Sequence, residues 1–191
     1  MIDYQHIIDK FYPEANALRD ILLVHSRGVA RLALQVVDKH PELQADRDIV
    51  EAGAMLHDIG ITMCDANGIE CYGTEPYICH GTLGGRMLRD HAAELGYSAE
   101  DIEPYARICE RHTGTGLTLE QIVERNLPLP HKDLTPETIE EQIVCYADKF
   151  FSKTHPERQK TYEQATRSLA KFGEAGLIKF GKWHEAMRID G

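Results

Sequence analysis

Apolar residues recur at three- and four-residue steps along almost the whole chain, and this helical periodicity limits the fold more than any other feature. The strongest segment predicts a helix over residues 16–40. Its apolar stripe consists of Leu18, Ile21, Leu22, Val29, Leu32 and Val36, with His25 on the same face. No segment requires the alternation of a half-buried strand, so the chain is predicted to be all-α, a helical bundle.

Capping residues followed by an apolar stripe predict where the remaining helices begin. The predicted starts are Asp46 or Asp48, His80, Ser98, Thr118, Thr135-Pro136, Thr154 and Ala175. Gly60 and Gly96 are predicted to end two of these helices. Turn residues cluster over 61–79 and 126–134, which are predicted to be loops. The chain is interpreted as one domain over residues 1–191, with a core over about 20–153 and a helical extension over about 154–191.

The charge and hydropathy of the chain limit the kinds of molecule that it is expected to bind. The chain has 21 basic and 31 acidic residues, a formal net charge of -10, which disfavours binding to a nucleic-acid duplex or a basic membrane-surface role. No apolar run approaches the ~20 residues of a membrane span, and the segment after Met1 lacks the features of a signal peptide. The chain is therefore expected to be cytoplasmic, with no membrane partner. Nothing in the sequence predicts an oligomeric state.

The five cysteines predict reduced thiols rather than disulfides. Their number is odd and no C-x-x-C pair occurs, so neither a disulfide framework nor a zinc ribbon is indicated. Cys64, Cys71 and Cys79 do cluster in one predicted loop. A structural zinc there is the less favoured alternative, because the spacing departs from known patterns.

The dipeptide His57-Asp58 sets two metal-ligand groups where an apolar helix meets a glycine, in Leu56-His57-Asp58-Ile59-Gly60. Alone, the pair is weak evidence, since a motif is a hypothesis until its context is known. His25, His80, His112 and Asp148 strengthen it, because each lies in an apolar stretch or at a predicted helix end. Burying the carboxylate of Asp148 after Ile143-Val144-Cys145-Tyr146-Ala147 would be costly unless a cation balanced it. Helical bundles build metal centres from such converging side chains.

The ordered set His25, His57-Asp58, His80, His112 and Asp148 resembles the HD-domain superfamily of metal-dependent phosphohydrolases, and the HDIG string resembles its HDIG-type members. The segments His80-Gly81-Thr82-Leu83-Gly84 and Tyr146-Ala147-Asp148-Lys149 are similar to those of bacterial HD enzymes that split diadenosine tetraphosphate symmetrically. The resemblance covers roughly residues 20 to 153.

The resemblance implies two transition-metal ions, divalent or mixed-valence. One is held by His25, His57 and Asp148, the second by His80 and His112, and Asp58 bridges them. His57 and Asp58 are thus the expected catalytic residues, and a water or hydroxide between the ions is the expected nucleophile. Mixed nitrogen and oxygen ligands suit Fe, Mn, Co, Ni or Zn.

One departure from the family narrows the substrate. Cyclic-dinucleotide phosphodiesterases of the HD-GYP branch carry a lysine directly after the HDIG string and a Gly-Tyr-Pro segment, whereas this chain has Ile61 and no such tripeptide. Cyclic di-GMP is therefore not the expected substrate.

Several basic residues near the predicted ligands are candidates for phosphate contact, against the alternative of solvated or salt-bridged side chains. They are Arg27, Arg31, Arg111, His131, Lys132 and Lys149. His131 and Lys132 lie in a proline-bounded loop that is placed to reach over the site.

The leading hypothesis is a metal-dependent phosphohydrolase acting on a small phosphorylated substrate, a nucleotide or a related phosphoester or phosphoanhydride. Two alternatives remain. Some proteins of the HD fold with the same six ligands are di-iron oxygenases that act on a polyol or a phosphonate. A sensor that binds a nucleotide without turnover is the third class.

Overall fold

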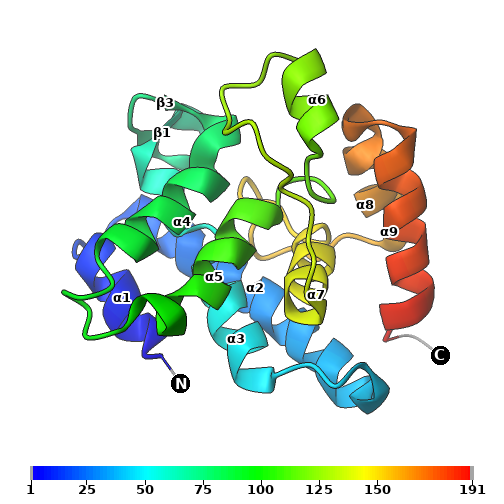
Figure 1. The fold of residues 1–191 in the computed structure, drawn as a ribbon, viewed down its shortest axis with the longest axis horizontal. Helices are drawn as coiled ribbons and strands as arrows, with labels where there is room; N and C mark the ends of the chain where they lie inside the picture. Colours follow the sequence, from blue (N-terminus) through cyan, green and yellow to red (C-terminus); the bar gives the residue numbers. More distant parts are fainter. Residues whose placement is uncertain (1, 190–191) are drawn as a thin grey trace.

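Helices form most of the regular structure in residues 2–189, the part of the chain that the computed structural model describes. The α-helices are α1 Tyr4–Phe11, α2 Ala17–Lys39, α3 Arg47–Leu56, α4 His80–Asp90, α5 Ala99–Arg111, α6 Leu119–Glu124, α7 Ile139–Asp148, α8 Tyr162–Leu169 and α9 Glu174–Met187 (Figure 1). Single turns of 3₁₀-helix lie at Pro41–Leu43, Asn67–Ile69, Tyr77–Cys79 and Ala170–Phe172, and a longer one at Ile59–Met63. The predicted all-α class is confirmed.

The centre of the bundle is built from α2, α3, α5 and α7. The helix α2 packs against α3 and α7, and α5 packs against α3, α4 and α7. The predicted stripe of α2 supplies Leu22, Val29, Leu32 and Val36 to the core, all buried. Burying each such side chain contributes about 1.5–3 kcal/mol, which makes this face the main reason that α2 is helical along its length.

Three of the predicted helix starts coincide with an observed side-chain cap. The side chain of Asp46 accepts hydrogen bonds from the backbone of Asp48 and Ile49, and Ser98 and Thr118 each form a capping box. Such caps satisfy backbone N–H groups that have no partner within the helix, and each contributes about 1 kcal/mol. Local sequence therefore fixes where α3, α5 and α6 begin.

Two predicted helix starts are wrong. The helix α7 begins after Thr138, not at Thr135-Pro136, because Glu141 reaches back to the backbone of Thr138 in a capping box. The helix α8 begins after Thr161, which caps it together with Gln164, whereas residues from Thr154 onward form turns.

Two other helix boundaries also differ from the prediction. The helix α4 ends at Asp90, before the predicted stop at Gly96, and α3 ends at Leu56 rather than at Gly60.

The segment 61–79 is not a simple loop, because it holds a small three-stranded sheet. Its strands are β1 Cys64–Ala66, β2 Cys71–Tyr72 and β3 Glu75–Pro76, in the order β2-β1-β3. β1 pairs antiparallel with β2 and parallel with β3. Strands of two or three residues are too short to show alternation, which is why the sequence did not indicate them. The sheet leads directly into Tyr77 and the start of α4.

The C-terminal helices share the core of the bundle. The helix α9 packs against α7 and α8, and Phe180 of α9 is fully buried against Tyr146, Phe150 and Tyr162. Figure 1 shows α8 and α9 along one side of α7. Within residues 2–189, no helix has both the length and the apolar character that crossing a membrane needs.

Candidate metal centre

Helix ends bring the predicted ligands together. His57 is the C-cap of α3 and Asp58 follows it, His112 is the C-cap of α5, His80 begins α4 and Asp148 ends α7. His25 alone comes from a helix interior, on the buried face of α2. All six side chains are buried, with no more than 9% of any residue exposed. The structure thus places the six predicted ligands in one cluster.

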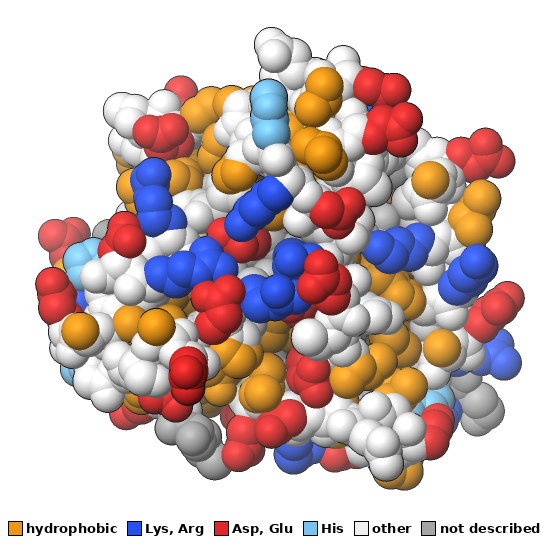
Figure 2. All heavy atoms as spheres, viewed as in Figure 1, with side chains coloured by type: hydrophobic (Ala, Val, Ile, Leu, Met, Phe, Trp, Pro, Cys, Tyr) orange, Lys and Arg blue, Asp and Glu red, His pale blue; other side chains and the backbone are white. Residues whose placement is uncertain are grey.

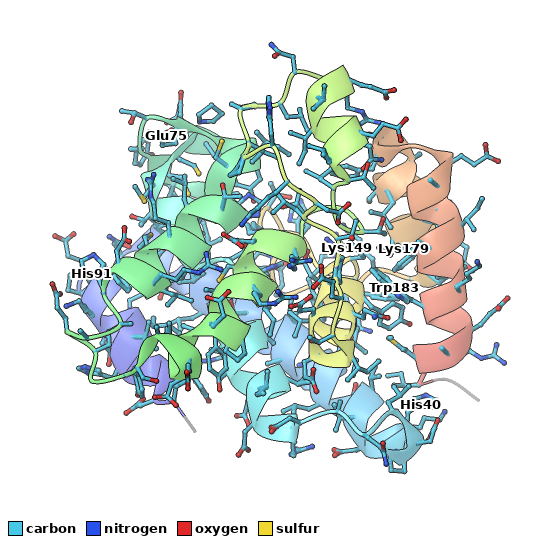
Figure 3. The ribbon with its side chains drawn as sticks, in the orientation of Figure 1. His40, Glu75, His91, Lys149, Lys179 and Trp183 are labelled. Carbon is cyan, nitrogen blue, oxygen red and sulfur yellow. The ribbon has the colours of Figure 1, made fainter. Side chains whose placement is uncertain are left out.

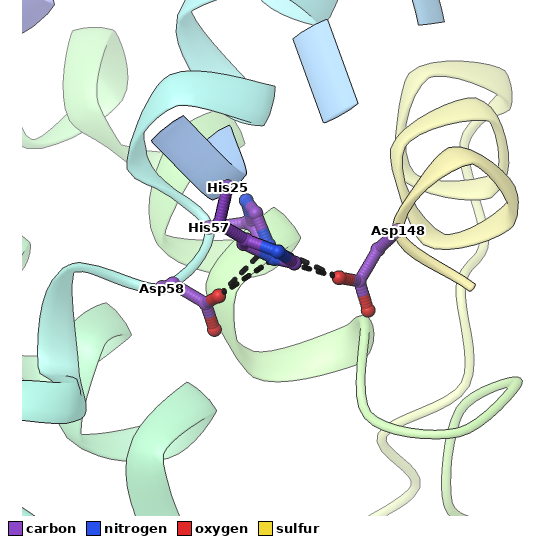
Figure 4. A group of neighbouring side chains, drawn as sticks. All are labelled: His25, His57, Asp58 and Asp148. Atoms are coloured by element: carbon purple, nitrogen blue, oxygen red, sulfur yellow. Dashed lines mark hydrogen bonds and ion pairs between the residues drawn. The ribbon is translucent and has the colours of Figure 1, made fainter. Parts of the chain in front are cut away.

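The first half of the cluster consists of His25, His57, Asp58 and Asp148 (Figure 4). The Nε2 atoms of His25 and His57 lie 3.2 Å apart, and Asp148 Oδ1 lies 3.0 Å from His25 and 3.4 Å from His57. Asp58 Oδ2 lies 3.1 Å from both ring nitrogens. Four donor atoms therefore face one point.

The second half consists of Asp58, His80 and His112. The Nε2 atoms of His80 and His112 lie 2.9 Å apart, and each is 3.4 Å from Asp58 Oδ1. The two carboxylate oxygens of Asp58 thus belong to different halves. Asp58 is the only residue common to both halves within the described part of the chain.

Backbone hydrogen bonds fix the orientation of three rings. The Nδ1 atoms of His57, His80 and His112 each lie 2.7 Å from a backbone carbonyl three residues earlier. A carbonyl can only accept, so each Nδ1 carries the proton and donates it. In the neutral ring, Nε2 then presents a lone pair to the cluster, which is the arrangement of a metal-binding histidine with an oriented tautomer.

The donor atoms fit a metal ion. Two atoms bound at ~2.1 Å to one ion are about 3.0 Å apart at a right angle and about 3.4 Å apart at a tetrahedral angle. The observed separations of 2.9 to 3.4 Å match this range. Lone pairs of neighbouring ring nitrogens repel one another unless a cation lies between them. The cluster could therefore hold metal, with mixed nitrogen and oxygen ligands that suit a transition metal.

Buried charges shift the pKa values of the cluster in opposite directions. Burial lowers the pKa of His57, but the carboxylates of Asp58 and Asp148 outweigh it and raise that pKa to about 9. For His80, burial and the neighbouring His112 lower the pKa to about 3. Burial raises the pKa of Asp58 and of Asp148, yet the facing cationic groups hold both well below the usual range. Both carboxylates are therefore ionised at neutral pH.

Lys153 is a site residue that the sequence interpretation missed. Its Nζ atom lies 2.7 Å from Asp58 Oδ2 and 5.8 Å from the centre of the Tyr77 ring. Tyr77 in turn stacks on His80, with ring centres 4.7 Å apart. One feature of the sequence could have indicated this residue. Lys153 closely follows two aromatic residues, Phe150 and Phe151, in the turn after α7.

Two cavities reach the cluster. The first, of about 280 Å³, is lined by His80, His112 and Asp148 and by four lysines, Lys149, Lys153, Lys160 and Lys171. The second, of about 430 Å³, adjoins His25 and Asp148 and shares Tyr77, Lys153 and Lys171 with the first. A molecule outside the protein can therefore reach the cluster past basic side chains.

Of the basic residues predicted to contact substrate, Lys149 lies beside the cluster. Its Nζ atom donates to the carbonyl of His112 at 2.8 Å and pairs with Asp148 Oδ2 at 2.7 Å. Figure 3 labels Lys149 at the end of α7. Lys149 also lines the first cavity, and its contact with substrate stays a prediction.

The other five predicted contact residues do not line either cavity. Arg27 and Arg31 are exposed on α2, on a different face from His25. Arg111 pairs with Glu137, Lys132 pairs with Glu110, and His131 is exposed. Figure 2 shows basic and acidic side chains lying next to one another on the face over α4, α5 and α7. Arg111 and Lys132 are therefore paired with acidic neighbours.

The cysteines do not form a second metal site. Cys64, Cys71 and Cys79 are buried free thiols. Among the described residues, the groups that could hold an ion contain only histidine and aspartate. Burial raises the pKa of Cys64 to about 12 and that of Cys71 to about 11, which keeps both thiols protonated.

The fold is a helical bundle whose core gathers four histidines and two aspartates that could hold metal, five of them at helix ends and His25 within α2. The chain belongs to the HD domain family, whose profile matches residues 22–152. The match spans every residue of the cluster, from His25 to Asp148, and ends just before Lys153.

Similar proteins occur in archaea. The chain is 36% identical over 141 residues to the uncharacterized protein MJ0778 of Methanocaldococcus jannaschii, covering 73% of this chain and 71% of that protein. It is 37% identical over 133 residues to the tRNA (cytidine(56)-2'-O)-methyltransferase of Picrophilus torridus, covering 70% of this chain. The protein of that name from Thermoplasma volcanium is 33% identical over 150 residues, covering 78% of this chain. The chain spans only 32% and 37% of these two methyltransferases.

Solved structures share the fold. The HD domain of the L. monocytogenes phosphodiesterase PgpH superposes with a TM-score of 0.55 at 18% identity, covering 92% of this chain and 93% of that domain. The same domain in complex with Cyclic-di-AMP gives a TM-score of 0.51 at 19% identity, with 93% of both chains covered. At this level of identity the likeness establishes the helical architecture.

Proposed function

We propose that the protein is a metal-dependent phosphohydrolase that acts on a nucleotide or a related phosphoester or phosphoanhydride. The observation that carries this proposal is the position of Asp58, whose two oxygens face two separate sets of donor atoms. The first ion would be held by His25, His57 and Asp148, the second by His80 and His112, and Asp58 would bind both. Fe, Mn, Co, Ni and Zn are the candidate metals.

Bound ions would polarise the phosphoryl oxygens of a substrate and lower the pKa of a water molecule. The protein's own residues hold the ligand atoms in place and supply positive charge for the substrate. Backbone carbonyls hold His57, His80 and His112 in one tautomer, so their Nε2 atoms keep a fixed position. Tyr77 covers the ring of His80. Lys149 and Lys153 carry positive charge beside the cluster, where a phosphate would lie.

A nucleotide substrate is supported by the fold as well as by the charges. The HD domain of PgpH, a protein of this fold, binds Cyclic-di-AMP in the complex with it. The methyl-transfer activity in the name of two relatives is not part of this proposal, because the chain spans about a third of each of those proteins. Cyclic di-GMP is not among the proposed substrates, because Ile61 and not a lysine follows the HDIG string.

The proposal is tested by turnover of protein reconstituted with each candidate metal. The panel contains nucleoside mono-, di- and triphosphates, dinucleoside polyphosphates and cyclic dinucleotides. We expect hydrolysis of at least one class, and its loss in His57→Ala and Asp58→Ala. His91→Ala is the matched control, since His91 lies away from the cluster, near Phe11 and Glu94. Turnover that survives both ligand substitutions would refute the centre.

The same preparations separate the alternatives. Oxygen uptake by iron-loaded protein, coupled to a polyol or a phosphonate and without phosphate release, would establish an oxygenase instead. Protein that binds nucleotides but hydrolyses none of them with any of the metals would be a sensor.

A further inference from the structure

The first cavity is basic in a chain that is acidic overall. Four lysines line it, while Asp148 is the one carboxylate in its wall, and the chain as a whole carries a net charge of -10. Two of the lysines have local partners, since Lys149 pairs with Asp148 and Lys153 pairs with Asp58. Their charges are balanced within the cluster.

Lys160 and Lys171 are different. Lys160 Nζ donates to the carbonyl of Phe151 at 3.3 Å, and Lys171 Nζ lies 5.2 Å from the centre of the Phe172 ring. Within residues 2–189, neither lysine has an ion pair with a carboxylate. Two lysines without an acidic partner thus line the cavity that leads to the cluster of predicted metal ligands.

The lysines also affect one another. Burial lowers the pKa of Lys160, Asp148 opposes this, and the charges of Lys149, Lys153 and Lys171 lower it further. An anion in the cavity would relieve this repulsion and would accept hydrogen bonds from both ammonium groups.

Both lysines lie outside the part of the chain that matches the HD family profile, residues 22–152. Lys160 precedes α8 and Lys171 lies in the 3₁₀ turn Ala170–Phe172 after it. The apolar side of the same cavity is formed by Phe151, Leu169 and Phe172. The C-terminal helices therefore complete a pocket whose other wall contains the predicted ligands His80, His112 and Asp148.

We propose that Lys160 and Lys171 form a subsite for a second phosphate group, so that the substrate of this enzyme carries at least two phosphates. This inference rests on the proposed hydrolase function for the identity of the first phosphate, which lies at the cluster. The second phosphate lies against the two lysines, and the uncharged part of the substrate lies beside Phe151, Leu169 and Phe172.

Binding of inorganic pyrophosphate to the metal-free protein tests the subsite without any turnover. We expect Lys160→Gln and Lys171→Gln each to weaken the Kd measured by calorimetry about tenfold. Lys160→Arg, which keeps the charge, should retain most of the affinity. Lys182→Gln is the matched control, because Lys182 is exposed on α9 and lines neither cavity. Equal Kd values in all four variants and the wild type would overturn the subsite.

Turnover by the metal-reconstituted enzyme separates this inference from the proposed function. For ADP compared with AMP, we expect the two Gln variants to raise KM selectively for the diphosphate. Lysine-dependent pyrophosphate binding without hydrolysis of any phosphoester would support the subsite and reject the hydrolase. Hydrolysis whose KM is the same in wild type and both variants would support the hydrolase and reject the subsite.

Discussion

Lys153 Nζ lies 2.7 Å from Asp58 Oδ2, so a lysine from the turn after α7 balances the carboxylate at the middle of the cluster. The Asp58 side chain is fully buried and that of Lys153 is 12% exposed. Burial lowers the pKa of Lys153, but the negative charge of Asp58 outweighs it and the pKa is raised. Lys153 therefore remains charged and serves as the counter-ion of Asp58 when no metal is bound.

Lys153→Gln should destabilise the metal-free protein far more than the metal-loaded protein. Removing one partner of a buried ion pair costs about 3–5 kcal/mol, because the other charge is left without compensation. Bound metal would restore a positive charge beside Asp58. Urea unfolding in the presence of a chelator, and again with Mn²⁺, measures both free energies. Lys182→Gln should change either value by less than about 0.5 kcal/mol. A loss of equal size with and without metal would show that Lys153 acts through packing alone.

The number of bound ions should depend on which half of the cluster is changed. We expect two ions per chain in the wild type and one in His80→Ala, because the second half then retains only His112 and Asp58. Asp58→Asn should reduce the content of both sites, since each half uses one of its oxygens. Elemental analysis of dialysed protein gives the counts. His91→Ala, at the position labelled in Figure 3, should keep the wild-type content. A wild-type count in His80→Ala would contradict the division into two halves.

The sequence predicts a helix correctly where the apolar stripe or the cap that indicates it is formed by residues close together in the chain. The stripe of α2 and the caps Asp46, Ser98 and Thr118 depend on residues within one or two turns of each other. The start of α8 carries an equally local signal, the Thr161 capping box, which competes in the sequence with the pattern that begins at Thr154. The paired strands at 64–76 depend on contacts between short segments, which periodicity cannot reveal.

The cluster was predictable to the extent that its ligands occur in a familiar order along the chain. Lys153 was not, because its role depends on the turn after α7 folding back to Asp58, 95 positions earlier in the sequence. The sequence predicts Gly60 as the end of a helix. Its backbone instead lies against α4, where an added Cβ would be 2.3 Å from the carbonyl oxygen of His80. Such close approaches are properties of the packed structure.

Lowering the pH should destabilise the protein, partly because the carboxylate of Glu110 becomes protonated. Burial raises the pKa of this carboxyl, but its hydrogen bonds with Arg89, the nearer at 2.7 Å, outweigh the burial and lower the pKa. A lowered pKa means that the stabilisation is present above the unfolded pKa of about 4.3 and is lost as the pH falls further. Because Arg89 is 33% exposed, we expect Glu110→Gln to cost only about 1 kcal/mol at pH 7.

Urea unfolding at pH 7, 5, 4 and 3 should show the free energies of unfolding of wild type and Glu110→Gln converging at the lowest pH. Glu14→Gln, at an exposed position, should follow the wild-type curve. Parallel curves for Glu110→Gln and the wild type would contradict this account.

Gly60→Ala should damage both stability and the half of the cluster that contains His80. The new Cβ would lie 2.3 Å from the carbonyl oxygen of His80 and 2.4 Å from the backbone nitrogen of Gly84, and neither backbone atom can move aside alone. The start of α4 must shift away from the Ile59–Met63 turn, which moves His80 relative to Asp58. We expect a loss of about 3 kcal/mol in the free energy of unfolding, typical of severe overpacking.

Gly68→Ala provides the matched control, because an added Cβ there meets no atom within 4 Å. It should leave stability within about 0.5 kcal/mol of the wild type and metal content unchanged. In Gly60→Ala, metal content should fall together with stability, since the shifted His80 ring can no longer share an ion with His112. A Gly60→Ala protein of wild-type stability would show that α4 and the Ile59–Met63 turn can separate freely. The close packing of these two segments would then not be what holds His80 at the cluster.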